Sequence, residues 1–132
     1  MNWFKPCSYD PAQKRSFHAT ARTRLRRLTA ELGLMPGTYD IRSSAGGMAV
    51  SGEVTLHGEY LYMQVCQPAT SWDSGILIRS CRGRKDYTGG PNHFASLRLL
   101  DDLPALADRV RAVCGDGRRR STSADSITAA AE

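Results

Sequence analysis

The stretch "MAVSGEVTLHGEYLYMQVCQ", residues 48–67, decides the fold class because apolar and polar residues alternate on both sides of a central turn. The turn is formed by His57 and Gly58. In the second run the apolar residues share one face of an extended chain and the polar or aromatic ones share the other: Leu61, Met63 and Val65 against Tyr60, Tyr62 and Gln64. Two alternating runs joined by turn residues predict an antiparallel hairpin.

Further alternating runs flank this hairpin. "TYDIRS" (38–43) comes before it, and "ILIRSC" (76–81) and "FASLRLL" (94–100) come after it. We therefore expect strands at 38–43, 48–56, 59–67 and 76–81, with a fifth short strand at 94–100. Gly52, inside the second of these strands, predicts a bulge.

Amphipathic helices are predicted at both ends of the strand region. Asp10 and Pro11 can cap and start a helix, and Gly33 can end it. Its apolar stripe recurs at helical spacing: Phe17, Ala21, Leu25, Leu28 and Leu32. The run "DDLPALADRVRAVCG" (101–115) has acids at its start, where the helix dipole favours them, and a terminating glycine. The sequence predicts an α+β fold of two layers: an antiparallel sheet of four to five strands with an N-terminal and a C-terminal helix.

Composition and length indicate one domain. The 132 residues are 41% hydrophobic and 23% charged, as in globular proteins. We expect a single domain at 1–114 and a disordered tail at 115–132, where no apolar pattern is long enough to pack. No secretory leader or membrane span is evident, and the four cysteines form no C-x-x-C pair, so we expect a cytoplasmic protein with reduced thiols and no membrane partner.

The net charge of +5 is concentrated in two islands. Residues 11–32 hold six cations against Glu31, and residues 79–98 hold five cations against Asp86. Such islands predict a polyanionic or acidic partner, namely nucleic acid or an acidic protein. Both islands also fit solvated surface segments without a ligand. We expect the two islands to form one positive surface.

The later island contains a candidate binding loop, "RSCRGRKDYTGGPNH" (79–93). Arginine and lysine suit phosphate, tyrosine can stack on a base, and asparagine can read a base edge. The predicted binding residues of this loop are Arg82, Arg84, Lys85, Tyr87, Asn92 and His93. On the first helix, we expect electrostatic support from Arg15, Arg22 and Arg26.

Catalytic and metal chemistry is weakly indicated. Cys66, Cys81 and His93 match no structural zinc spacing, and we interpret the two cysteines as small buried hydrophobes. Cys81 with His93 could form a nucleophile pair, but no oxyanion hole can be identified. We therefore expect no enzymatic activity, no metal and no cofactor, with a small Cys/His hydrolase as the remote alternative. His18 and His57 are expected at the surface.

The segment "GRKDYTGGPNHFASLRLLDDLPALADRV" resembles one shared by small proteins of proteobacterial plasmids, phages and integrative elements. The resemblance covers residues 75–112 and is strongest at "GRKDYTGG-NHF". It implies an accessory protein of mobile DNA and carries no assigned functional residue. Two hypotheses follow: a non-enzymatic nucleic-acid-binding protein, or a protein–protein inhibitor or adaptor acting on an acidic or nucleic-acid-binding host protein, such as a component of a defence system. The oligomeric state stays open.

Overall fold

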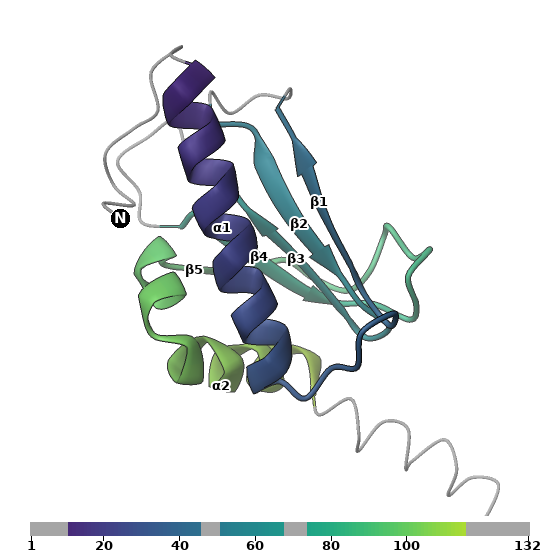
Figure 1. The fold of residues 1–132 in the computed structure, drawn as a ribbon. Helices are drawn as coiled ribbons and strands as arrows, with labels where there is room; N and C mark the ends of the chain where they lie inside the picture. Colours follow the sequence, from purple (N-terminus) through teal and green to yellow (C-terminus); the bar gives the residue numbers. More distant parts are fainter. Residues whose placement is uncertain (1–10, 46–50, 68–73, 116–132) are drawn as a thin grey trace, which may run out of the picture.

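A computed structural model describes residues 11–45, 51–67 and 74–115 of the chain. Its elements are, in order, α1 (Pro11–Glu31), β1 (Asp40–Ser44), β2 (Glu53–His57), β3 (Leu61–Val65), β4 (Ile76–Ser80), β5 (His93–Ala95), a 3₁₀ helix η1 (Leu97–Asp101) and α2 (Leu103–Cys114) (Figure 1). The predicted α+β class is confirmed. Residues 116–132, which form nearly all of the predicted disordered tail, lie outside the described residues.

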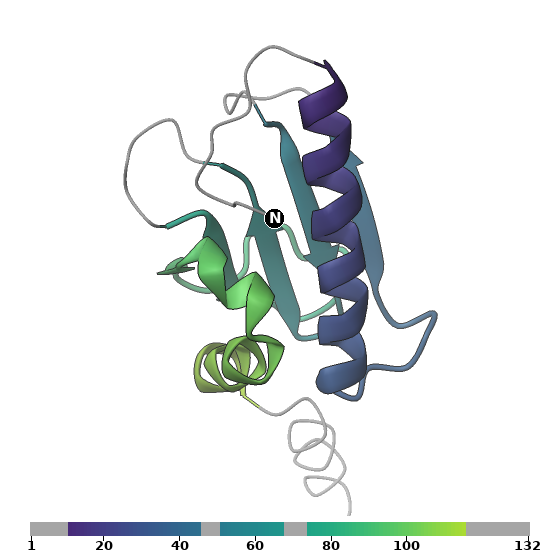
Figure 2. The same cartoon turned by 60° about the vertical axis from the view of Figure 1, so that its left-hand side comes forward.

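The five strands form one antiparallel sheet in the order β1-β2-β3-β4-β5, so each strand pairs with its neighbour in the chain. Both helices cover the same face of this sheet (Figures 1 and 2). The core lies between them and consists of fully buried side chains from the helices and from alternate strand positions, such as Leu25, Leu56, Met63, Ile78 and Leu106. The sheet therefore has one face in the core and one face turned away from both helices.

Helix α1 follows its predicted stripe. Phe17, Ala21, Leu25 and Leu28 are all buried at 1% exposure or less. Leu32 is only partly buried because the helix ends at Glu31. The helix is terminated at Gly33, which has a φ of 73°. The backbone N–H of Leu34 then donates a hydrogen bond of 2.9 Å to the carbonyl of Thr29. This is the left-handed termination that glycine allows most readily.

Strands β1 and β2 both begin later than predicted. Thr38 is held in a turn, where its backbone N–H and its hydroxyl donate to the carbonyl of Met35 at 3.1 and 2.6 Å, so β1 begins at Asp40. Gly52 has a φ of 69° and leads into β2, and a side chain there would collide with the carbonyl oxygen of Ser44. Residues 46–50, which include the start of the predicted second strand, lie outside the described residues.

The predicted fifth strand at 94–100 is correct only at its start. Strand β5 spans His93–Ala95, and the side chain of Ser96 then accepts a hydrogen bond of 3.0 Å from the backbone of Arg98. This cap begins η1, in which Leu97 and Leu100 are both buried. Their spacing of three residues places them on one side of a 3₁₀ helix, so an apolar run that resembles a strand forms a helical turn instead.

His57 is not a surface turn residue, contrary to the prediction. It is the last residue of β2 and is fully buried, and the turn lies at the following residues, where Gly58 donates a backbone hydrogen bond of 2.8 Å to Leu61. His18 is half-buried on α1, with its Nε2 2.7 Å from the carbonyl oxygen of Ser51. Both rings are therefore part of the folded structure rather than solvated side groups.

Candidate nucleic-acid interface

The sheet face turned away from the helices carries a continuous row of side chains across all five strands. The strand register places each of these side chains directly opposite the next, from β1 to β5. On its own strand, each is flanked by residues whose side chains point to the opposite face, toward the core. We call this row the Phe94 row: Arg42, Thr55, Gln64, Leu77 and Phe94. Within the described part of the chain, no helix covers this row (Figures 1 and 2).

A second row on the same face lies beside the first and is partly covered by a loop. We call it the His57 row: Asp40, His57, Tyr62 and Arg79. Asn92 lies next to it, because its Oδ1 accepts a long hydrogen bond of 3.5 Å from Arg79. The loop at residues 81–90 packs on this row, since the ring of Tyr87 lies edge-on to His57 with centroids 5.2 Å apart. The loop therefore borders the open Phe94 row.

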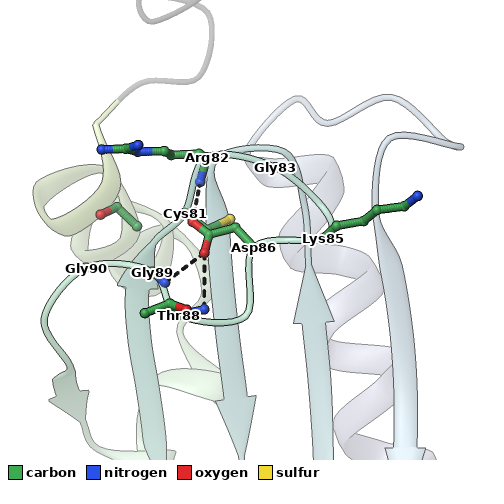
Figure 3. Close-up of a pocket in the computed structure, with 9 residues that line it drawn as sticks. Cys81, Arg82, Gly83, Lys85, Asp86, Thr88, Gly89 and Gly90 are labelled. Atoms are coloured by element: carbon green, nitrogen blue, oxygen red, sulfur yellow. Dashed lines mark hydrogen bonds between the residues drawn. The ribbon is translucent and has the colours of Figure 1, made fainter.

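Asp86 organises the 81–90 loop from within. Its carboxylate accepts backbone hydrogen bonds of 2.9 Å from Arg82, 3.1 Å from Thr88 and 3.0 Å from Gly89 (Figure 3). These bonds, that from Gly89 most strongly, hold the pKa of the Asp86 carboxyl below its usual value of 3.8. Gly89 has a φ of 62°, and a Cβ there would lie 2.7 Å from the carbonyl oxygen of Ser80. The backbone donors that a bound phosphate would use are thus already taken by a carboxylate of the protein itself.

A hollow of about 710 Å³ lies along this loop and is lined by it from Ser80 to Gly90. Figure 3 shows the side chains of Arg82 and Lys85 leaving the loop in opposite directions. They therefore do not converge on one phosphate. Two separated cations beside an exposed sheet face suit an extended polyanion better than a single small anion.

Arg84 has a structural role in the loop. Its guanidinium donates hydrogen bonds of 2.7 Å both to the carbonyl of Gly37 and to Oδ1 of Asp40. The same contact holds the pKa of the Asp40 carboxyl below its usual value. Arg84 joins the loop to the start of β1, and its charge is paired with Asp40, so it is not offered to a ligand.

Two arginine side chains of the face are packed on aromatic rings. The guanidinium of Arg79 lies 4.3 Å from the ring centroid of Tyr62, and that of Arg42 lies 5.8 Å from the centroid of Tyr87. Arg79 also donates a hydrogen bond of 3.3 Å to the carbonyl of Thr88. Within the described ranges, Arg42 and Arg79 form no ion pair with a carboxylate, and the same holds for Arg82 and Lys85. The face therefore carries four positive charges that form no ion pair with a carboxylate of the described residues.

His57 holds the loop against the sheet. Its Nε2 lies 3.0 Å from the carbonyl oxygen of Gly83, which can only accept, so this nitrogen carries the proton. Its Nδ1 lies 3.5 Å from Nη2 of Arg42. Burial is the main cause that lowers the pKa of His57 from 6.5, and the positive charge of Arg42 lowers it further. The ring is therefore a neutral anchor between the sheet and the loop.

The expected single positive surface is not formed, because α1 packs on the core face of the sheet and the 81–90 loop lies on the opposite face. On the helix, Arg15 and Arg26 are exposed, whereas Arg22 donates to the carbonyl of Ile41 at 3.2 Å. His93 is also exposed, but it pairs with Ile78, so its side chain points to the helix side of β5. Of the predicted residues, the fold brings Arg82, Lys85, Tyr87 and Asn92 together around the outer face.

The cysteines give the hydrolase alternative no support. Cys81 is 3% exposed and its thiol donates to the carbonyl of Gly58 at 3.5 Å, so it is not presented to solvent as a nucleophile. Burial raises the pKa of the Cys66 thiol, and the nearby Glu53 raises it further, which disfavours the thiolate. Across residues 11–45, 51–67 and 74–115, no three His, Cys, Asp or Glu side chains are placed to hold a metal ion.

Sequence reasoning missed the residues of the sheet face itself. Arg42, Arg79 and Phe94 lie in three different strands, and only the register shows that they share a face. Alternation within a single strand does separate Tyr62 and Gln64 from the core side chains of β3. A combined search for aromatic and arginine residues at the outward positions of every predicted strand would have found this surface.

Comparison of the chain with protein-family models, with curated proteins and with solved structures finds no match. No helix among the described residues is long and apolar enough to cross a bilayer.

Proposed function

We propose that the protein binds nucleic acid through the outer face of the sheet together with the bordering 81–90 loop, and that its role is binding rather than catalysis. The observation that carries this proposal is that exposed rings lie on one sheet face together with cations that, among the described residues, form no ion pair. Tyr87 is 59% exposed and Phe94 is 52% exposed. Arg42 and Arg79 lie among them and Arg82 and Lys85 lie at the border, as nucleic-acid-binding surfaces require.

The acidic groups of this region do not cancel its charge. Asp40 is paired with Arg84, and Asp86 is bonded to the loop backbone. An acidic protein could use the same cations, which would make the chain an inhibitor or adaptor. The aromatic side chains favour nucleic acid, because every base offers a flat face for stacking next to the phosphate that the cations attract.

The first experiment is affinity purification of the tagged full chain from its host, with and without nuclease treatment. Recovery of nucleic acid that nuclease removes supports the proposal. A single stoichiometric protein partner that survives nuclease, without any bound nucleic acid, contradicts it and supports the inhibitor alternative.

The second experiment measures how the affinity for an oligonucleotide depends on salt. Each cation that contacts a phosphate contributes about 0.7 to 0.9 to the slope of log affinity against log salt. We expect Arg82→Ala and Lys85→Ala each to lower the slope by about that amount. Arg27→Ala, an exposed residue of α1, is the matched control and should leave it unchanged. Slopes equal to wild type in both loop variants would contradict the assignment.

The same measurement on Arg15→Ala and Arg26→Ala tests the contribution predicted from sequence for the helix. Because α1 packs on the opposite side of the sheet from the 81–90 loop, one ligand on the outer face does not reach these side chains. We expect no change in slope for either variant. A decrease as large as that of the loop variants would move the interface to the helix.

A further inference from the structure

We infer that the ligand is a single-stranded nucleic acid whose bases stack on the Phe94 row, an inference that rests on the proposed function. The row offers apolar surface at the positions where bases would lie. Phe94 is half-exposed on β5, and its cross-strand neighbour Leu77 is half-buried beside it. Together they form a flat apolar patch at one end of the row, while Arg42 lies at the other end.

The dimensions of the row suit a short extended strand. Neighbouring strands of a sheet lie about 4.8 Å apart, so the four intervals from β1 to β5 span about 19 Å. Bases that lie flat on the sheet are spaced more widely than the roughly 3.4 Å repeat of bases stacked on one another, so this distance accommodates fewer than about six nucleotides. The sites of single-strand-binding domains are of this size.

The polar residues in the middle of the row can contact base edges. The Oε1 of Gln64 accepts a hydrogen bond of 3.3 Å from the hydroxyl of Tyr62, which fixes the amide and leaves its NH₂ group turned away from that oxygen. Thr55 lies between Gln64 and Arg42 and adds a hydroxyl. An amide and a hydroxyl can bond to any base, so they add affinity with little sequence preference.

Three of the four cations lie beside the row, and Arg42 lies on it. Arg79 belongs to the His57 row, and Arg82 and Lys85 lie on the bordering loop. A strand that stacks its bases on the Phe94 row can therefore direct its phosphates toward these three side chains. The guanidinium of Arg79 lies 4.3 Å from the ring centroid of Tyr62, which fixes the position of its charge beside the row.

Duplex nucleic acid fits this face poorly. Its bases are stacked on one another and present only their edges in the grooves, so it would reach the border cations but leave Phe94 and Leu77 unused. Among the described residues no helix or two-stranded ribbon projects from this sheet face, so the face cannot enter a groove (Figures 1 and 2). Single strands are therefore the form that uses the whole surface.

The test compares an oligothymidylate and an oligouridylate of about twelve nucleotides with a DNA duplex of the same length, by fluorescence anisotropy on the full chain. We expect both single strands to bind, and the duplex to bind at least about tenfold more weakly. Phe94→Ala should weaken single-strand binding by about 5- to 150-fold, corresponding to one stacked base. Phe94→Trp should restore it. Met35→Ala removes a large apolar side chain that is 68% exposed and lies outside this face, and it should have no effect.

The outcomes distinguish a failure of the proposed nucleic-acid binding from a failure of the single-strand inference alone. No binding of any oligonucleotide at low salt overturns the proposed function and this inference together. Equal affinity for duplex and single strand, with Phe94→Ala equal to wild type, overturns only the single-strand inference. If urea unfolding shows that Phe94→Ala is not folded, Phe94→Leu replaces it, since it removes the exposed ring and keeps an apolar side chain on β5, and the same loss is expected.

Discussion

The buried imidazole of His57 predicts a specific dependence of stability on pH. The ring is fully buried, with its Nε2 proton facing the carbonyl of Gly83 and its other nitrogen facing the guanidinium of Arg42. A second proton would place a charge at a fully buried position next to a cation. Both effects lower the pKa of His57 in the folded protein below 6.5, although the hydrogen bonds to the backbone of Gly83 and Asp86 and, less strongly, the charge of Asp40 oppose them.

The direction of the pH dependence, and the pH range in which it occurs, follow from the difference in proton binding between the folded and the unfolded chain. Below pH 6.5 the unfolded chain binds a proton at His57 while the folded protein does not, so the free energy of unfolding decreases as the pH falls. The decrease continues until the pH reaches the lower pKa of the folded state. One proton changes the free energy of unfolding by at most about 1.4 kcal/mol per pH unit. The carboxyls of Asp40 and Asp86, whose pKa values lie below 3.8, lose their contribution only at more acidic pH.

The assay is urea unfolding at a series of values from about pH 8 to about pH 5. The wild type should lose stability below pH 6.5, and His57→Gln, whose amide can still donate to Gly83, should lose less over the same window. His18→Gln is a control for an imidazole that is only half-buried. Identical pH profiles for wild type and His57→Gln, or a wild type that becomes more stable as the pH falls from 6.5, would refute the reasoning.

Three further changes test the packing and the loop. Leu56→Ala removes a fully buried side chain of β2 and should lower the free energy of unfolding by about 2 to 5 kcal/mol; a loss below about 1 kcal/mol would contradict its place in the core. Asp102→Ala removes the cap that accepts from the backbone of Ala105 at 3.3 Å and should cost about 1 kcal/mol in urea unfolding, whereas an unchanged midpoint would count against the cap. Gly89→Ala places a Cβ 2.7 Å from the carbonyl oxygen of Ser80, at a φ of 62°. The same oxygen accepts the hydrogen bond from the amide of Gly90, so this amide should exchange with deuterium faster in the variant. Unchanged exchange would show that the loop tolerates a side chain there.

Local patterns predicted the elements of this fold well. The spacing from Phe17 to Leu28 and the terminating Gly33 specify α1 without reference to the rest of the chain. The alternation in β3 likewise fixes which side chains enter the core. Both patterns depend on residues a few positions apart, and such short-range periodicities can be seen in a single sequence.

The assembly of the site could not be predicted in the same way. Two basic segments of similar composition lie on opposite faces because α1 needs the apolar face of the sheet, while the 81–90 loop is tied to the other face by the contacts of His57 with Gly83 and Tyr87. Arg84 resembles a ligand-binding residue in sequence but pairs with Asp40, which is 44 residues away. Long-range pairings of this kind depend on the strand register, and composition carries no information about that register.

The outer face of the sheet is the centre of this account, and an NMR titration tests it most directly. Amide shifts of the labelled full chain would be followed as an oligothymidylate of about twelve nucleotides is added. The account predicts that the largest changes lie at Thr55, Gln64, Leu77 and Phe94 and in the 81–90 loop. Changes confined to α1, or no changes at low salt, would contradict it.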